Sequence, residues 1–327
     1  MNQYLLAIDG GGTKCDAVTV RTDTGTVIGW GHCNPRTEGS GKGREGSGRS
    51  VQSARIAAQQ ALKSIQSGKL YTTNINHEVW MPENNGMDLA GYVPTREYDS
   101  ALTLAGFRHG VVALAGTGAF IFARRKDGKH LILDGLGPNL CDQGSGHHIG
   151  LMAIRASAKS SWHPRHETSL AQRLRDYLGV NSHRRDLDHI LSGYMMAQPD
   201  RSEIAAIAKL VNEEAEKGDR IALGIIETAA NALADTLSDV VYQLALSHEC
   251  YPLIGTGSVC VKSQLFWNAF CHAVKGIAPG LEPIRNTLPA VYGVALRALE
   301  IMGRDTDPIR KKWQSEEIHL TQSLYGT

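Results

Sequence analysis

Long apolar stretches are absent from this sequence of 327 residues, and no run approaches the ~20 residues that a membrane-spanning helix needs. The first residues lead straight into a short apolar segment, Tyr4 to Ile8, without the charged and apolar regions of a signal peptide. We therefore expect neither a transmembrane helix nor a secretory signal.

An excess of one charge is also lacking. The chain has 34 Lys and Arg against 33 Asp and Glu, which leaves a formal net charge of +1 at pH 7. Proteins that bind nucleic acid or acidic membranes through electrostatics usually carry a clear positive excess. The composition therefore gives no reason to expect either partner.

Cysteines at metal-binding spacing are missing as well. The six cysteines form no Cys-x-x-Cys pair and are scattered along the chain. His147 and His148 are adjacent, so on a helix they would point in different directions, which suits a single metal ion poorly. This pattern disfavours a zinc site or a disulfide framework and predicts reduced thiols in a cytoplasmic protein. The cysteines are Cys15, Cys33, Cys141, Cys250, Cys260 and Cys271.

The chain does have the material for a large fold. Its length predicts about two domains at ~150 residues each. Hydrophobic residues make up 42% of the sequence, which is enough to build substantial cores.

The most informative stretch follows the first apolar segment. Tyr4 to Ile8 has the length of a buried strand, then come Asp9, three glycines, Thr13 and Lys14, and a second strand over 17–20. This is a hairpin and not a Walker P-loop, which would end in Gly-Lys-Ser/Thr before a helix. Glycine amides can approach an anion closely, and Asp9 is placed to hold a hydrated Mg²⁺ beside a phosphate. An ordinary tight glycine turn is the alternative.

The same pattern returns about a hundred residues later. An apolar strand over 111–115 precedes Gly116-Thr117-Gly118 and a second strand over 119–124. Each hairpin is followed by a third strand, at 27–31 and 130–133, which predicts a duplicated βββ unit. A third glycine loop, Gly255 to Ser258, follows a short strand over 252–254.

The spacing of apolar residues predicts helices over much of the remaining chain, and one further segment has the composition of a strand. Asp99 precedes a short helix over 100–105 that ends at Gly106, and 78–81 resembles a strand. The other expected helices span 51–65, 149–159, 170–178, 204–216, 221–246 and 288–301.

Six segments together resemble the sugar kinase/heat-shock ATPase/actin superfamily, and within it the N-acetylglucosamine kinase and BadF/BadG/BcrA/BcrD ATPase-like group. The order and spacing of these segments carry the resemblance, which covers residues 4 to about 304. The segments are Ile8 to Lys14, Cys33 to Pro35, Tyr98 to Ala101, Ala115 to Gly118, Asp134 to Gly146 and Ile254 to Ser258.

The resemblance implies an α/β fold of two ribonuclease H-like (actin-like ATPase) domains with an ATP/sugar cleft between them. We expect an N-terminal domain over 1–106 and a larger C-terminal domain over 107–287. A closing helix over 288–304 should pack back on the first domain, and 305–327 should be a polar, peripheral tail.

By the same resemblance the cofactors are ATP and Mg²⁺, with Asp9 as the metal ligand. Phosphoryl transfer depends mostly on positioning and charge stabilisation, for which backbone amides, hydroxyls and Mg²⁺ are suited. The first two glycine loops would embrace the phosphates and the third would line the adenosine pocket. The expected ATP-binding residues are Gly10, Gly11, Gly12, Thr13, Lys14, Gly116, Thr117, Gly118, Gly255, Thr256, Gly257 and Ser258.

The resemblance also implies a sugar site with Asp99 as the catalytic base, taking a proton from a sugar hydroxyl. Asp99 could instead be a helix N-cap, and Asp88 is the competing carboxylate. Asn34 could form an Asx turn before proline, and Asp142 could cap the next helix. The expected substrate-binding residues are Asn34, Asp99, Gly135, Leu136, Gly137, Asp142 and Gly146.

Two departures from the family pattern affect the sugar site. Leu136 stands where relatives usually carry Trp, so an aromatic surface is missing. Residues 82–86 replace a Gly/Ala/Ser-rich loop that helps to shape the sugar pocket.

We interpret the chain as a kinase that transfers the γ-phosphoryl group of ATP to an amino sugar, N-acetylglucosamine or glucosamine, at O6. ATP, a sugar and a second copy in a homodimer are the expected partners. The alternatives are an activator ATPase for a 2-hydroxyacyl-CoA dehydratase, which would need an iron–sulfur cluster, and a nucleotide- or sugar-binding regulator without turnover.

Overall fold

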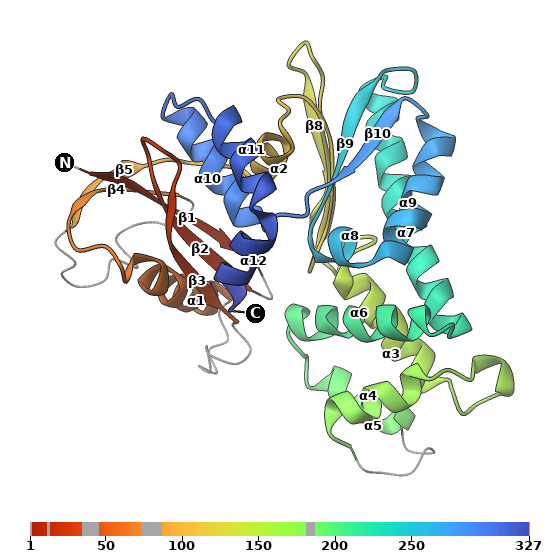
Figure 1. The fold of residues 1–327 in the computed structure, drawn as a ribbon. Helices are drawn as coiled ribbons and strands as arrows, with labels where there is room; N and C mark the ends of the chain where they lie inside the picture. Colours follow the sequence, from red (N-terminus) through yellow and green to blue (C-terminus); the bar gives the residue numbers. More distant parts are fainter. Residues whose placement is uncertain (1, 12–13, 35–45, 74–86, 181–186, 327) are drawn as a thin grey trace. The chain divides into compact units, whose positions relative to one another are not determined.

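The computed structural model describes residues 2–11, 14–34, 46–73, 87–180 and 187–326, which form two compact units (Figure 1). The first unit comprises Met1–Arg108 and Asn286–Thr327, and the second comprises His109–Arg285. Each unit is built on one five-stranded mixed sheet. No helix within the described ranges is long and apolar enough to cross a membrane.

The sheet of the first unit has the strand order β3-β2-β1-β4-β5. β1 pairs antiparallel with β2 and parallel with β4, and the hairpin with its third strand is present as the sequence predicts. The sequence pattern did not indicate β4 or β5, and the strand expected at 78–81 lies outside the described residues. The strands are β1 (Gln3–Gly10), β2 (Cys15–Arg21), β3 (Val27–Cys33), β4 (Gly68–Thr72) and β5 (Met87–Tyr92).

Both faces of this sheet are covered, which explains the uninterrupted apolar character of β1. Leu5 and Ala7 belong to one core, and Leu6 and Ile8 belong to the other, because successive side chains of a strand point to opposite faces. α1 (Gly46–Leu62) contributes to the core of Leu6 and Ile8, and α10 (Ala290–Ile301) to that of Leu5 and Ala7. α2 (Glu97–Ala105) packs against α10.

The expectation of a peripheral tail over 305–327 is wrong. These residues form α11 (Asp307–Ser315) and α12 (Glu317–Tyr325). Trp313 is only 1% exposed, and its Nε1 donates to the Gly25 carbonyl oxygen at 3.1 Å. Leu320 and Leu324 are buried in the same core. Trp313, Leu320 and Leu324 fall on inward-facing helical positions, so the segment completes the first unit.

The sheet of the second unit repeats the arrangement of the first, in the order β8-β7-β6-β9-β10. β6 pairs antiparallel with β7 and parallel with β9, and β7 pairs antiparallel with β8. The expected second βββ hairpin is therefore present, whereas the sequence pattern did not indicate β10. The strands are β6 (Gly110–Ala115), β7 (Ala119–Arg124), β8 (His130–Asp134), β9 (Tyr251–Thr256) and β10 (Leu281–Arg285).

Seven α-helices are described in the second unit. α3, α4, α5 and α6 lie together below the sheet of this unit in Figure 1, and α7 packs against both α6 and β7. α9 lies against α7, and α8 contacts β6 and β9. The helices are α3 (Gly146–Ala158), α4 (Leu170–Leu178), α5 (Leu187–Met196), α6 (Arg201–Glu216), α7 (Arg220–Gln243), α8 (Ser258–Lys262) and α9 (Gln264–Ile277).

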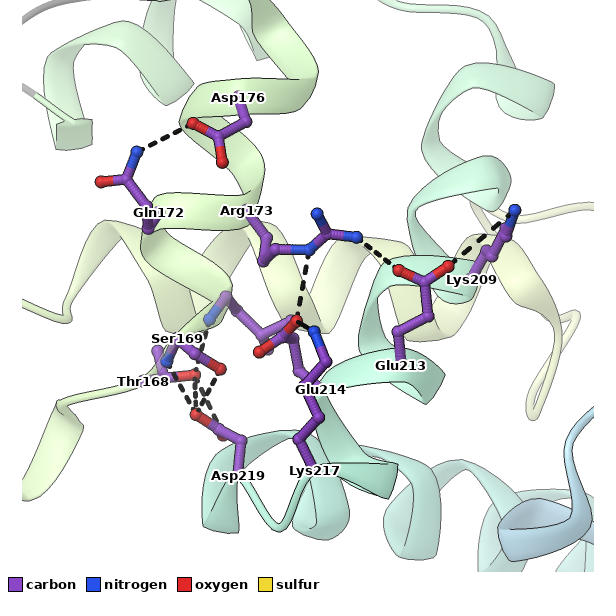
Figure 2. A network of polar contacts seen from close by, with 11 residues as sticks. Thr168, Ser169, Gln172, Arg173, Asp176, Lys209, Glu213, Glu214, Lys217 and Asp219 are labelled. Carbon is purple, nitrogen blue, oxygen red and sulfur yellow. Dashed lines mark hydrogen bonds and ion pairs between the residues drawn. The ribbon is translucent and has the colours of Figure 1, made fainter.

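A polar network fastens the start of α4 to the start of α7 (Figure 2). Asp219 is the N-cap of α7 and accepts from the Ala222 amide at 2.9 Å. It also accepts from the Ser169 amide at 2.7 Å and from the Thr168 hydroxyl at 3.0 Å. Figure 2 shows a second branch in which Arg173 of α4 contacts Glu213 and Glu214 of α6. These bonds stabilise the helical part of the unit.

Candidate functional site

The first glycine hairpin joins β1 to β2 with an open backbone. Gly10 lies opposite Cys15, and the Gly11 amide donates to the Lys14 carbonyl oxygen at 2.9 Å. Gly10 and Gly11 are exposed. Gly12 and Thr13, two of the predicted ATP-binding residues, lie outside the described residues. Exposed glycine backbone of this kind lets an anion approach the main chain closely.

The strand register brings more of the predicted residues to this edge of the sheet. Cys15 pairs with Cys33, so Asn34 follows β3 at the same end as the Gly10 turn. β1, β4 and β5 are parallel, so their carboxyl ends also meet here, the place where ligands of such sheets usually bind. α2 begins shortly after β5, at the same edge.

Asp99 is the third residue of α2 and is half-buried. The helix begins three residues earlier than expected and its N-cap is Arg96, so the interpretation of Asp99 as an N-cap is wrong. Gly106 ends the helix in a left-handed conformation, with φ 87°, as the sequence predicts. Asp88 lies instead on edge strand β5, exposed and opposite Lys69. The two competing carboxylates thus lie on different elements.

Asp9, the predicted metal ligand, lies close enough to Glu97 for its charge to affect that residue, which the sequence analysis did not name. Burial raises the pKa of Asp9 to about 6, with Lys14 opposing this shift and Asp16 adding to it. Glu97 is exposed over part of its surface, but desolvation and the charge of Asp9 raise its pKa to about 7. The described residues contain no group of three metal-ligating side chains. Mg²⁺ usually binds through one or two carboxylates plus phosphates and water, so this pair fits it.

Lys14 has close partners that the sequence did not indicate. Its ammonium lies 2.6 Å from Asp16 Oδ2 and 2.6 Å from the hydroxyl of Tyr325. Asp16 stands two residues away on β2, whereas Tyr325 is distant in the sequence. Only the packing of α12 in this unit shows that Tyr325 is a partner of Lys14.

The second glycine hairpin, in the other unit, packs on two further predicted segments. The Gly116 amide donates to the Gly118 carbonyl oxygen at 2.8 Å, and the Gly146 amide donates to the Gly116 carbonyl oxygen at 2.7 Å. Gly257 has φ 85°, and a Cβ there would clash with the Ala115 carbonyl oxygen. The structure therefore brings together Gly116–Gly118, the start of α3 at Gly146, and the loop Gly255–Ser258.

The segment from Asp134 to Gly146 is organised by Asp134, which the sequence analysis did not single out. Its Oδ1 accepts from the amides of Gly135 at 2.6 Å and Asp142 at 2.5 Å, and its Oδ2 accepts from the Gln143 amide at 3.1 Å. Leu136, at the departure from the family pattern, is 68% exposed. The loop is thus folded around one carboxylate and presents an aliphatic side chain to solvent.

Asp142 is held inside the second unit. It is 1% exposed, forms an ion pair with Nη2 of Arg201, and accepts from the Ala119 amide at 3.3 Å. The N-cap of α3 is Ser145, so the alternative role of Asp142 as a helix cap is wrong. Arg201 also crowds Gly118, where an added Cβ would clash with its guanidinium. Asp142 and Arg201 therefore link α6 to the glycine hairpin.

Comparison with known proteins agrees with this architecture. The BadF/BadG/BcrA/BcrD ATPase family matches residues 6–298. The N-acetylmuramic acid/N-acetylglucosamine kinase of Clostridium acetobutylicum is 27% identical over 203 residues, 61% of this chain and 65% of that protein. The N-acetyl-D-glucosamine kinase of Dictyostelium discoideum is 30% identical over 191 residues, 58% of this chain and 59% of that protein. The matches span less than two thirds of either relative.

The fold also matches solved structures. A candidate N-acetylglucosamine kinase from Chromobacterium violaceum superposes with a TM-score of 0.60 at 19% identity. The match covers 90% of this chain and 98% of that one. At this identity the likeness shows a shared fold.

Proposed function

This chain belongs to the BadF/BadG/BcrA/BcrD ATPase family, and we propose that it transfers the γ-phosphoryl group of ATP to a hydroxyl of an amino sugar. The observation that carries the proposal is the packing of the Gly255–Ser258 loop and the start of α3 on the Gly116–Gly118 hairpin. Three segments far apart in sequence meet there through backbone contacts that leave no room for larger side chains. Glycine-rich backbone of this kind lets a phosphate approach the main chain closely.

In each unit, the glycine loops are the segments that we propose to contact nucleotide. Gly10 and Gly11 supply exposed glycine backbone and Lys14 supplies a cation in the first unit, and Gly116–Gly118 supplies the equivalent turn in the second. Asp9, with Glu97 beside it, would hold Mg²⁺, which neutralises phosphate charge when bound. A cation would also favour the ionised form of Asp9, whose pKa burial raises.

The acceptor we propose is N-acetylglucosamine or glucosamine, with O6 as the phosphorylated oxygen. The names of the two curated relatives support an amino sugar. Asp99 would take the hydroxyl proton and Asn34, at the same sheet edge as Asp9, would bind neighbouring hydroxyls. A homodimer in the cytoplasm completes the proposal, and sedimentation of the purified protein tests the dimer.

A panel of sugars tests the reaction directly. The purified protein with Mg·ATP should release ADP with N-acetylglucosamine or glucosamine and much less with glucose or without sugar. Phosphorus–proton coupling in the product spectrum would identify the oxygen that carries the phosphate. ADP release that is the same with and without every amino sugar would refute the proposal.

A further inference from the structure

The ammonium of Lys14 is held by two fixed partners within the first unit. Lys14 Nζ donates to Asp16 Oδ2 and to the Tyr325 hydroxyl, both at 2.6 Å, and lies 5.2 Å from the centre of the Tyr325 ring. The Tyr325 hydroxyl in turn donates to Asp16 Oδ2 at 2.9 Å. The three groups close a triangle of hydrogen bonds. An ammonium has three protons, so one remains for a further acceptor.

Asp16, the carboxylate in this triangle, is buried and therefore needs well-placed hydrogen-bond partners. Its side chain is 0% exposed, and a buried carboxylate is costly unless it is well paired. His32 Nδ1 lies 2.7 Å from Asp16 Oδ1, and the His32 ring meets the Tyr325 ring edge-on at 5.1 Å. Burial disfavours the charge of Asp16, but hydrogen bonds from His32 and Lys14 outweigh this, and its pKa lies below the ordinary value. The buried carboxylate thus holds the Lys14 ammonium beside it.

Tyr325 is itself fixed by the packing of α12. Leu320 and Leu324 are buried in the core of the first unit. The Tyr292 hydroxyl donates to the Leu320 carbonyl oxygen at 3.0 Å and accepts from Trp30 Nε1 at 3.1 Å. α12 also packs against β3. The hydroxyl of Tyr325 is therefore set by the same core that positions the glycine hairpin.

We propose that Tyr325 is a positioning residue of the nucleotide site, which acts by holding the Lys14 ammonium beside the Gly10–Lys14 hairpin. The inference rests on the proposed function, because it assigns Lys14 to a phosphate group. It adds a residue that lies beyond 298, the last residue that the family matches. Through Tyr325, α12 thus helps to position the phosphate-binding group of the Gly10–Lys14 hairpin.

Tyr325→Phe removes only the hydroxyl and keeps the ring that packs on Lys14 and His32. We expect the Kd and KM for Mg·ATP to rise roughly tenfold, the lower end for a lost hydrogen bond to a charged group. The KM for the sugar should change less than about twofold, within the range of an indirect effect. Calorimetric titration with Mg·ATP and steady-state kinetics measure these values.

Tyr292→Phe is the matched control. It also removes a buried tyrosine hydroxyl that contacts α12, but that hydroxyl contacts Leu320 and Trp30 and not Lys14. It should lower the melting temperature without raising the Kd for Mg·ATP. An equal rise in both variants would show that Tyr325 acts only through stability and would overturn the inference.

A double-variant cycle tests whether Tyr325 acts through Lys14. Lys14→Met should weaken Mg·ATP binding more than Tyr325→Phe does, and the combined variant should bind no more weakly than Lys14→Met alone. Additive losses, or normal binding by Tyr325→Phe, would overturn the inference while leaving the kinase proposal intact. A wild-type protein that binds no Mg·ATP would overturn both.

Discussion

At the scale of single residues, the candidate carboxylates separate by their surroundings. Asp99 is half-buried in the first turn of α2, at the sheet edge where β1 ends. Asp88 is exposed on the edge strand β5. The sequence named both residues and placed Asp99 at the start of a helix. Only the fold showed that this helix begins near the carboxyl ends of β1 and β4 and that Asp88 lies on a strand. Asp99 remains our proposed base.

Asp99→Asn should abolish most turnover, because the amide keeps the size of the side chain but cannot accept the sugar proton. We expect kcat to fall about 10²–10⁴-fold, with the sugar KM less affected. Asp88→Asn is the control and should stay within about threefold of the wild type, as for an exposed surface change. If Asp88→Asn is inactive and Asp99→Asn is active, the catalytic base is Asp88 and not Asp99. If both variants are active, neither carboxylate is the catalytic base.

At the scale of the elements, those determined by local sequence signals could be predicted, whereas those that depend on distant contacts could not. The glycine hairpins and α7 follow from apolar runs, turn residues and helical spacing, which act over a few residues. β4, β5 and β10 escaped detection because short strands owe their stability to neighbours in the sheet. The start of α7 is an example of a local signal with a distant partner, since Asp219 caps its own helix and binds Thr168 and Ser169 as well.

Asp219→Ala should lower the free energy of unfolding at pH 7 by about 1–2 kcal/mol, the usual cost of a lost N-cap. Burial opposes the charge of Asp219, but hydrogen bonds from the amides of Ala222 and Ser169 outweigh it and its pKa is lowered. A lowered carboxyl pKa stabilises the fold above the unfolded value of about 3.9, and the effect is lost as pH falls through the folded pKa. The difference between variant and wild type should therefore shrink below about pH 4.

Denaturant unfolding at pH 7 and in a series below pH 4 measures this effect. Asp127→Ala is a control, because Asp127 accepts from the Lys129 amide in an exposed hairpin. It should cost about 0.5 kcal/mol or less. A loss at Asp219 that persists unchanged at low pH would contradict a role for its ionised form.

At the scale of the whole molecule, a duplicated sheet carries two related hairpins. Each unit has the same strand order and the same pattern of antiparallel and parallel pairs. The units differ in what is added: α11 and α12 complete the first, and α3 to α6 extend the second. The proposed nucleotide contacts are the glycine loops at the ends of β1, β6 and β9, so nucleotide should stabilise the folded protein.

Mg·ATP should raise the free energy of unfolding by about 2.7 kcal/mol at a hundredfold excess over its Kd, because it binds only the folded protein. Thermal denaturation with and without Mg·ATP measures the shift. ATP without Mg²⁺ should give less, and Asp9→Asn should remove most of the Mg²⁺-dependent part. The absence of any shift with Mg·ATP would refute the phosphate-binding role of the glycine loops.

The sequence alone determined the two glycine hairpins, the third glycine loop, most of the helices and the family. These features are local: a glycine turn needs particular residues at adjacent positions, and an amphipathic helix repeats every few residues. The tertiary structure alone decided the partners of the charged groups. Asp16 with Tyr325, and Asp142 with Arg201, are pairs that no spacing in the sequence predicts. A buried charged group needs a hydrogen-bonding partner, and in both pairs the fold supplies that partner from an element distant in the sequence.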